Sequence, residues 1–200
     1  MKPIRKIWLR IRRRAFELAG NNSGLAAVEF AMIIPLMAMM LVGTNEFSAG
    51  VAIDRKVTIM ARTLSDLTSQ NIAVSDDQLT NFFAASKAIM TPYSSAEVKG
   101  TISELYIDPK TLKAKVLWSK GSEPHTKGDI IDIPAALQIG STYLILSEVN
   151  YKYVPSVAWF INKVDGIKLS DYTFTRPRQG VCVIYPAPAA GATMPSCPTS

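Results

Sequence analysis

The sequence predicts an α+β protein in which a long N-terminal transmembrane helix continues into an amphipathic helix, followed by a second helix and a small antiparallel sheet. An uncharged apolar run begins soon after a basic N-terminus and has the length of a membrane-spanning helix. Beyond it, apolar residues recur first every three or four positions and later every second position, which are the periods of a helix and of a half-buried strand. Two hundred residues suffice for one modest hydrophobic core.

The positive charge of the chain is concentrated at its N-terminus. Residues 1–24 contain seven basic residues and one acidic residue, so their net charge equals the +6 of the whole chain. The remaining residues sum to zero, so the basic character belongs to a leader and gives no support for nucleic-acid binding. Because a basic flank marks the cytoplasmic side of a spanning helix, we expect residues 1–24 to be a cytoplasmic leader and the rest of the chain to lie on the periplasmic side.

The transmembrane helix is predicted over residues 25–53. Its apolar centre carries no charge and is bordered by Glu29 on one side and Glu46 on the other. Two alternatives remain open for this part of the chain. One is a cleaved secretory signal that uses the small residues Ser48-Ala49-Gly50, and the other is a twin-arginine signal at Arg13-Arg14.

Residues 54–92 are predicted to form two periplasmic helices. Apolar residues at helical spacing continue the span on one face of the first helix: Ile53, Val57, Met60, Ala61, Leu64 and Leu67. The second helix is expected from about Asp76 to Ile89, because Ser75 and Gln78 can form a capping box before it and Pro92 stops it. Its inward side chains are expected to be Leu79, Phe82 and Phe83.

Residues 93–185 are predicted to form the antiparallel sheet. Clean alternation of apolar and polar side chains marks two strands, one with Leu112, Ala114, Val116 and Trp118 and the other with Val149, Tyr151 and Tyr153. Val98–Ile107 and Leu169–Thr175 are strands with a weaker pattern. Asp108–Thr111 is a turn signal, and it is expected to join Val98–Ile107 to the strand that starts at Leu112 in a hairpin. Ile133–Leu137 is expected to be a short helical or looped crossover.

The chain closes with a tail, residues 186–200, that is rich in proline and alanine and too poor in bulky residues to fold alone. Cys182 and Cys197 flank this tail. In an oxidising compartment two cysteines are expected to pair, and the loop they close would stabilise the fold by about 3 kcal/mol. We expect this disulfide to have a structural role, and two unrelated thiols are the alternative.

No catalytic or metal-binding pattern is found in the sequence. The single histidine, His125, has no partner at metal-ligand spacing and is expected to be solvated in its loop. Nucleophile elbows, phosphate loops, dinucleotide fingerprints and zinc patterns are missing. Asp76 and Asp77 are explained by the favourable dipole at the start of a helix. We therefore expect no enzyme activity, no catalytic residues, no metal and no cofactor.

Glu29 is a charged residue in a position where a membrane helix normally has an apolar one. It lies at the cytoplasmic entrance of the apolar run, where an ionisable side chain is costly. Either it reaches the lipid headgroups or it is an assembly carboxylate that pairs with a cation. Cleavage after Gly24 would supply such a cation, the new amino group of Leu25 on a neighbouring chain, and pairing would offset much of the cost of the two charges.

The motif Gly24-Leu-Ala-Ala-Val-Glu29-Phe30-Ala-Met-Ile-Ile-Pro35, followed by Gly43-Thr-Asn-Glu46-Phe47, resembles the N-terminus of TadE-like and TadG-like proteins of the tight-adherence (Flp) pilus. Weaker matches follow at Tyr151–Pro155 and from Leu169-Ser170 to Arg176-Pro177-Arg178. The resemblance spans most of residues 21–180. Its N-terminal motif residues are Phe30, Pro35, Glu46 and Phe47.

This resemblance implies a pilin-like fold and a function as a minor pilin or pseudopilin of a type IV pilus assembly system. The role would be structural, in pilus biogenesis, adherence and biofilm formation. A prepilin-type peptidase would cut between Gly24 and Leu25, and Glu29 would be the fifth residue of the mature chain. The expected partners are other pilus subunits and inner-membrane pilus assembly proteins, with no nucleic acid and no small-molecule substrate.

The implied location is the bacterial inner membrane, crossed once, with the N-terminus in the cytoplasm and the C-terminal domain in the periplasm, in association with a pilus. Two other functions stay open. One is a membrane-anchored periplasmic scaffold or binding protein that is not incorporated in a filament. The other is a secreted enzyme released after Gly50.

Overall fold

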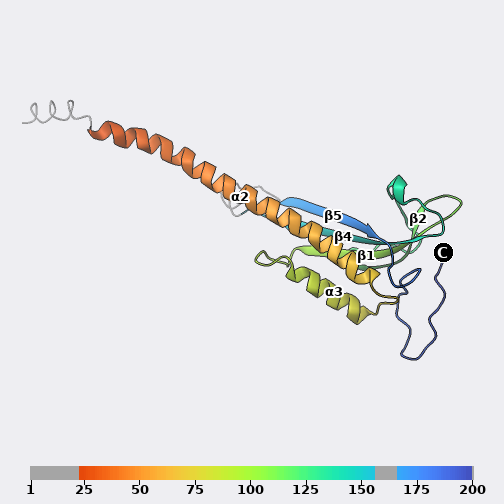
Figure 1. Cartoon of the computed structure of the whole chain (residues 1–200). Helices are drawn as coiled ribbons and strands as arrows, with labels where there is room; N and C mark the ends of the chain where they lie inside the picture. Colours follow the sequence, from red (N-terminus) through yellow and green to blue (C-terminus); the bar gives the residue numbers. More distant parts are fainter. Residues whose placement is uncertain (1–22, 156–165, 200) are drawn as a thin grey trace, which may run out of the picture. The chain divides into compact units, whose positions relative to one another are not determined.

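The computed structural model describes residues 23–155 and 166–199, so nearly all of the predicted leader lies outside the described residues. The chain divides into two compact units, residues 1–48 and residues 49–200, and we describe each by itself. The elements are α2 (Ser23–Ser69), α3 (Asp76–Ala88), β1 (Val98–Ile107), β2 (Ala114–Gly121), β3 (Ile130–Ile131), the 3-10 turn η1 (Ala135–Leu137), β4 (Tyr143–Tyr153) and β5 (Ile167–Thr175) (Figure 1). The predicted α+β class is confirmed.

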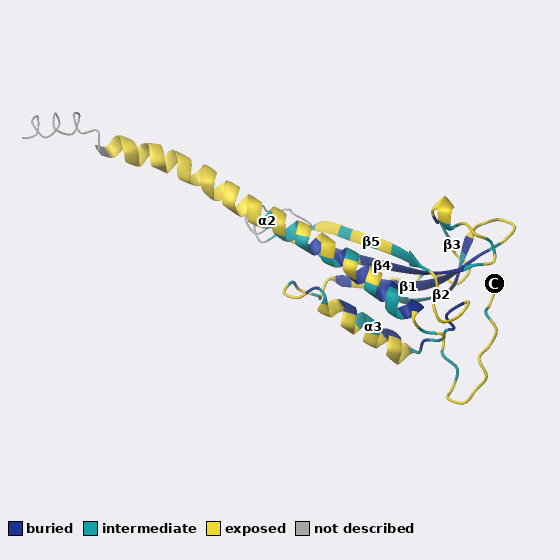
Figure 2. Ribbon diagram, in the orientation of Figure 1, coloured by how far each residue is buried: buried dark blue, intermediate teal, exposed yellow. Residues whose placement is uncertain are grey.

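The described part of the first unit is the N-terminal stretch of α2, residues 23–48. Its large apolar side chains are exposed, and Figure 2 shows this stretch without a buried residue. Among the described residues, α2 is the one helix that is long and apolar enough to cross a membrane. A single apolar helix of this kind fits a protein that spans the membrane once.

The second unit, residues 49–200, is built on a five-stranded antiparallel sheet with the strand order β3-β2-β1-β4-β5. The C-terminal part of α2 and α3 lie on the same face of this sheet (Figure 1). The predicted apolar stripe of α2 is buried there, with five of its residues fully covered: Ile53, Val57, Met60, Ala61 and Leu64. The capping box also forms, because Ser75 Oγ accepts from the Gln78 backbone N–H and Gln78 Oε1 accepts from the Ser75 N–H.

The opposite face of the sheet has a smaller apolar cluster of its own. The crossover that contains η1 packs over this face, so the predicted short helical crossover is confirmed. The cluster consists of Leu105, Ile107, Ala114, Val116, Ile133, Leu144 and Leu146. Because both faces are covered, the central strand β1 is buried along almost its whole length. This explains its weak alternation, because neither face of the strand is open to solvent and so no regular polar face is needed.

Strand β2 differs from the prediction in two respects. Leu112 lies before the strand, with a φ of 56° and an exposed side chain, rather than inside the sheet. The pairing of β2 with β1 skips Leu117, which is the extra residue of a β-bulge. The bulge sends Val116 to the outer cluster and Trp118 to the helix-facing core, although simple alternation predicted a common face for both.

Candidate functional site

The predicted processing and assembly residues lie in the first turns of α2. Gly24 follows Ser23, the first residue of the helix, and Leu25 is exposed. Glu29 is also exposed and follows Leu25 by four residues. Residues four apart in an α-helix lie one above the other on the same face, and side chains tilt toward the N-terminus of the helix. The helix therefore directs the Glu29 carboxylate toward the level of Leu25.

Glu29 has no basic side chain nearby in the described part of its own unit. Residues 23–48 contain no lysine or arginine, and the next basic residue along the chain is Arg55, 26 positions later. Ion pairs along one helix join residues three or four apart. A cation for Glu29 must therefore come from outside residues 23–48.

The other motif residues follow along the same helix. Pro35 lies inside α2, where it removes the N–H that would otherwise bond to the carbonyl of Ala31. The helix nevertheless continues to Ser69. Phe30 and Phe47 are both exposed, whereas Glu46 is half-buried. The motif thus places two aromatic side chains on the surface of an apolar helix.

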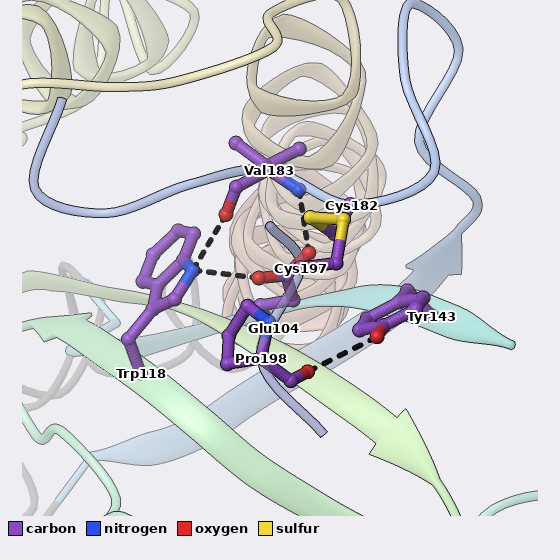
Figure 3. Close-up of a disulfide and its surroundings, with 7 residues drawn as sticks. All are labelled: Glu104, Trp118, Tyr143, Cys182, Val183, Cys197 and Pro198. Atoms are coloured by element: carbon purple, nitrogen blue, oxygen red, sulfur yellow. Dashed lines mark hydrogen bonds between the residues drawn. A yellow bond between two sulfur atoms is a disulfide. The ribbon is translucent and has the colours of Figure 1, made fainter. Parts of the chain in front are cut away.

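Sequence analysis missed a buried carboxylate in β1. Glu104 is fully buried on the helix-facing side of the sheet. Its Oε2 accepts a hydrogen bond from the Trp118 indole N–H at 2.8 Å, and its Oε1 accepts one from the Val183 backbone N–H at 2.6 Å (Figure 3). The Trp118 N–H also donates to the Val183 carbonyl, at 2.9 Å. Glu104 and Trp118 thus hold both backbone groups of one residue in the C-terminal segment.

Burial raises the pKa of the Glu104 carboxyl from its ordinary 4.5 to about 7. The hydrogen bonds from Val183 and Trp118 oppose this rise, because they favour the charged form, but desolvation outweighs them. The carboxyl therefore changes charge near neutral pH inside the core. The signal in the sequence that could have identified Glu104 is its position as the one charged residue in the stretch from Ile102 to Ile107.

The C-terminal segment is part of the core before it becomes a tail. Cys182, Val183 and Ile184 are all buried. Cys182 is bonded to Cys197 in a disulfide with Cα atoms 5.9 Å apart, so the expected pairing is present. Near the end of the chain, Tyr143 Oη donates to the Pro198 carbonyl at 3.0 Å (Figure 3). The disulfide therefore joins the tail to a core residue, and its role is wider than that of pinning the tail.

Replacing Cys197 with alanine is expected to lower the free energy of unfolding by about 3 kcal/mol, because the disulfide closes a loop with a sequence separation of 15. The measurement is a urea titration of the full chain in detergent micelles. Reduction of the wild-type disulfide should give the same loss, which makes it the control. An unchanged midpoint in both experiments would contradict the structural role of the bridge.

His125 and Asp76 make contacts that sequence analysis did not predict. His125 was expected to be solvated, but its Nε2 lies 2.6 Å from Glu148 Oε2 and its side chain is only 28% exposed. Asp76 lies in the first turn of α3, as expected. It also accepts a hydrogen bond from Tyr185 Oη at 2.7 Å. The Tyr185 hydrogen bond and the nearby Lys120 lower the pKa of Asp76. Asp76 thus contacts the C-terminal segment as well.

Comparison with protein families identifies the N-terminal part of the chain. Residues 24–63 match the family model of TadE-like proteins. The match begins at Gly24 and includes Leu25 and Glu29, and it confirms the resemblance found in the N-terminal motif. It ends within α2, so the weaker similarities downstream stay predictions. Neither the comparison with curated proteins nor that with solved structures gives a match to this chain.

Proposed function

Because residues 24–63 are TadE-like and the family belongs to the tight-adherence pilus, we propose that this protein is a minor pilin or pseudopilin of that pilus assembly system. The observation that carries the proposal is the position of Glu29. It is the one charged residue between Ser23 and Asn45, and it lies one helical turn after Leu25 in an exposed apolar helix.

In the proposed mechanism, the leader holds the N-terminus in the cytoplasm and α2 crosses the inner membrane. A prepilin-type peptidase cuts between Gly24 and Leu25, which removes the net charge of +6 carried by the leader and creates a new ammonium group. The Glu29 carboxylate of a neighbouring subunit then pairs with this ammonium. In surroundings of low dielectric constant, an unpaired charge costs several kcal/mol, and pairing offsets much of that cost.

The α+β unit, residues 49–200, has a structural role in this proposal and no catalytic activity or cofactor. The disulfide and the buried Glu104–Trp118–Val183 cluster support this role, because they fix the C-terminal segment of the chain to the sheet. Such a unit presents a folded surface on the periplasmic side to other pilus subunits and to inner-membrane assembly proteins. Adherence and biofilm formation would follow from the assembled pilus.

The proposed orientation predicts the result of reporter fusions. A reporter that is active only in the periplasm should be active when it is fused after Gly50 or after Ser200, because the basic leader stays in the cytoplasm. A cytoplasm-specific reporter at the same positions should be inactive, and it serves as the control. Cytoplasmic activity after Gly50 would exclude the proposed orientation.

Fractionation of piliated cells tests the function itself. A strain that lacks this chain should lose surface pili and regain them when the wild-type gene is supplied. In the wild type, the protein should co-purify with sheared pili or with the pilus assembly complex. The alternative of an independent scaffold would be favoured if the deletion strain had normal pili and if the wild-type protein stayed in the membrane fraction without other pilus proteins.

A further inference from the structure

Leu112 combines an unfavourable backbone conformation with an exposed side chain. Its φ of 56° lies in the left-handed region, where a bulky residue is strained and glycine or asparagine is the usual choice. The side chain is 41% exposed, and it belongs to neither apolar cluster of the fold. Packing within the chain therefore does not explain why a leucine occupies this position.

The turn that carries Leu112 is supported by the loop before β4. The Ser141 N–H in this loop donates to the Ile107 carbonyl at 2.9 Å, at the start of the turn. The loop and the turn touch so closely that a Cβ atom at Gly140 would lie 2.6 Å from Pro109 Cα. The exposed side chain of Leu112 is therefore presented on a well-supported turn.

Two lysines flank Leu112 along the turn. Lys110 and Lys113 are both exposed. Among the residues that the structure describes, neither of their ammonium groups has an ion-pair partner. Lys115 differs from them, because its Nζ lies 3.4 Å from Asp108 Oδ2. Leu112 is thus an apolar side chain between two unpaired positive charges.

The neighbouring edge strand shows the same pattern with the opposite charge. β3 is the outermost strand on this side of the sheet, and its Ile130 is 54% exposed. Asp129 and Asp132 flank Ile130 and are exposed as well. Asp129 accepts a hydrogen bond from the Thr126 N–H at 2.9 Å. In the described part of the chain, neither carboxylate forms an ion pair with a basic residue.

Strand pairing brings the two patterns together. Ala114 of β2 pairs with Ile131 of β3, and the next positions outward are Lys113 and Asp132. The register therefore places a basic group and an acidic group at the same level, at the end of both strands, although these two groups are not within ion-pair distance of each other. We call the six residues of the two patterns the charged edge: Lys110, Leu112, Lys113, Asp129, Ile130 and Asp132.

The charged edge is complementary to a copy of itself. It has a basic half and an acidic half, and each half contains one exposed apolar side chain, Leu112 or Ile130. A two-fold axis turns one copy so that its basic half faces the acidic half of the other copy. An unrelated partner would need the same division of charge, whereas a second copy of this chain already has it.

We propose that the charged edge joins two copies of this chain in a two-fold symmetric dimer. Lys113 of each copy pairs with Asp132 of the other, and Leu112 and Ile130 exclude water from the centre of the contact. The surface is small, so the dimer is weak and reversible. The proposal rests on the surface of the unit formed by residues 49–200 and not on a function in a pilus.

Opposite charge reversals test this contact in the full chain in detergent micelles. Lys113→Glu and Asp132→Lys should each weaken dimerisation at least tenfold, because like charges then face each other at both symmetric contacts. An equal mixture of the two variants should form mixed dimers, since the two reversed charges attract each other at one contact and the native pair forms at the other. Sedimentation velocity measures the association, and native mass spectrometry with one variant isotope-labelled identifies the mixed dimers.

Leu112→Gly tests the apolar centre of the contact without damage to the fold. Glycine adopts a positive φ without strain, so the urea midpoint of this variant should be unchanged or higher than that of the wild type. Dimerisation should nevertheless weaken, because the apolar contact of Leu112 is lost. Wild-type dimerisation by Leu112→Gly would contradict the proposed role of this side chain.

The matched controls are Lys87→Glu and Glu97→Lys, which make the same charge changes at exposed positions in α3 and before β1. Both should dimerise as the wild type does. A wild-type chain that stays monomeric would overturn the proposal, and so would charge-reversed variants of the charged edge that dimerise normally. A mixture without mixed dimers would also overturn it. No pilus component is present, so these outcomes are independent of the proposed function.

Discussion

Glu29→Ala should prevent the protein from entering pili while leaving its insertion in the membrane intact. Removing a charge from an apolar helix makes insertion easier rather than harder. Assembly should fail, because the ammonium group of Leu25 on a neighbouring subunit loses the carboxylate that pairs with it. An unpaired charge in a low-dielectric environment costs several kcal/mol, so we expect at least a tenfold loss of the protein from sheared pili, measured by immunoblot against the membrane fraction.

Three variants make this result specific. Glu29→Asp should restore incorporation only in part, because its shorter side chain draws the carboxylate back. Gly24→Leu should share the assembly defect and should also retain the mass of the uncut precursor. Met32→Ala shortens another exposed side chain of the same helix and should assemble normally. Normal pili and normal adherence in the Glu29→Ala strain would mean that Glu29 only contacts the lipid headgroups.

The stability of the α+β unit should fall as the pH rises from 5 to 8, and Glu104 should be the cause. The pKa of Glu104 is about 7 in the folded chain, raised by burial from an ordinary value of 4.5. Below pH 4.5 the carboxyl is neutral in both the folded and the unfolded chain, so its burial carries no charge penalty. Above pH 7 the folded chain must bury a carboxylate. The contribution that is lost across this window is about 3 kcal/mol.

Urea titrations of the full chain in micelles, followed by near-ultraviolet circular dichroism at pH 5 and pH 8, measure this change. Glu104→Gln removes the ionisable group, so the stability difference between the two pH values should shrink by about 3 kcal/mol relative to the wild type. Glu97→Gln changes an exposed glutamate and should leave the wild-type difference intact. Wild-type stability that rises from pH 5 to pH 8 by the same amount in all three proteins would contradict the burial of an ionisable Glu104.

Much of the fold follows from local patterns in the sequence. The capping box of Ser75 and Gln78 is a short-range signal, and it fixes the start of α3 where it was expected. The three-and-four spacing of Ile53, Val57 and Met60 identifies the buried face of α2, because a helix packed on a sheet must bury one face. These features depend on residues that are close together in the sequence.

The errors come from tertiary structure that local patterns do not contain. The bulge at Leu117 reverses the face of Trp118, and alternation alone cannot reveal an extra residue in a strand. One hydrogen bond of the buried Glu104 carboxylate comes from the backbone N–H of Val183, which lies 79 positions later in the sequence. The contact between His125 and Glu148 depends likewise on neighbouring parts of the folded sheet. A sequence shows such residues as isolated polar groups and does not show their partners.

The candidate assembly residues are a different case, because the sequence motif itself identified them. Gly24, Leu25 and Glu29 are close neighbours in the chain, and the periodicity of a helix is enough to place Leu25 and Glu29 on one face. The partner of Glu29 belongs to another molecule in the proposed mechanism. A single chain, whether as a sequence or as a structure, does not contain that partner.

The mature N-terminus tests the central proposal most directly. Intact-mass measurement of the protein purified from the membranes of piliated cells, combined with N-terminal sequencing, identifies the first residue of the mature chain. Processing by a prepilin-type peptidase predicts a chain that begins at Leu25, with its new amino group one helical turn before Glu29. A chain that begins at Met1 would indicate an uncut membrane anchor, and one that begins at Val51 would indicate a secreted protein. Either result would contradict the proposed pilin-like processing.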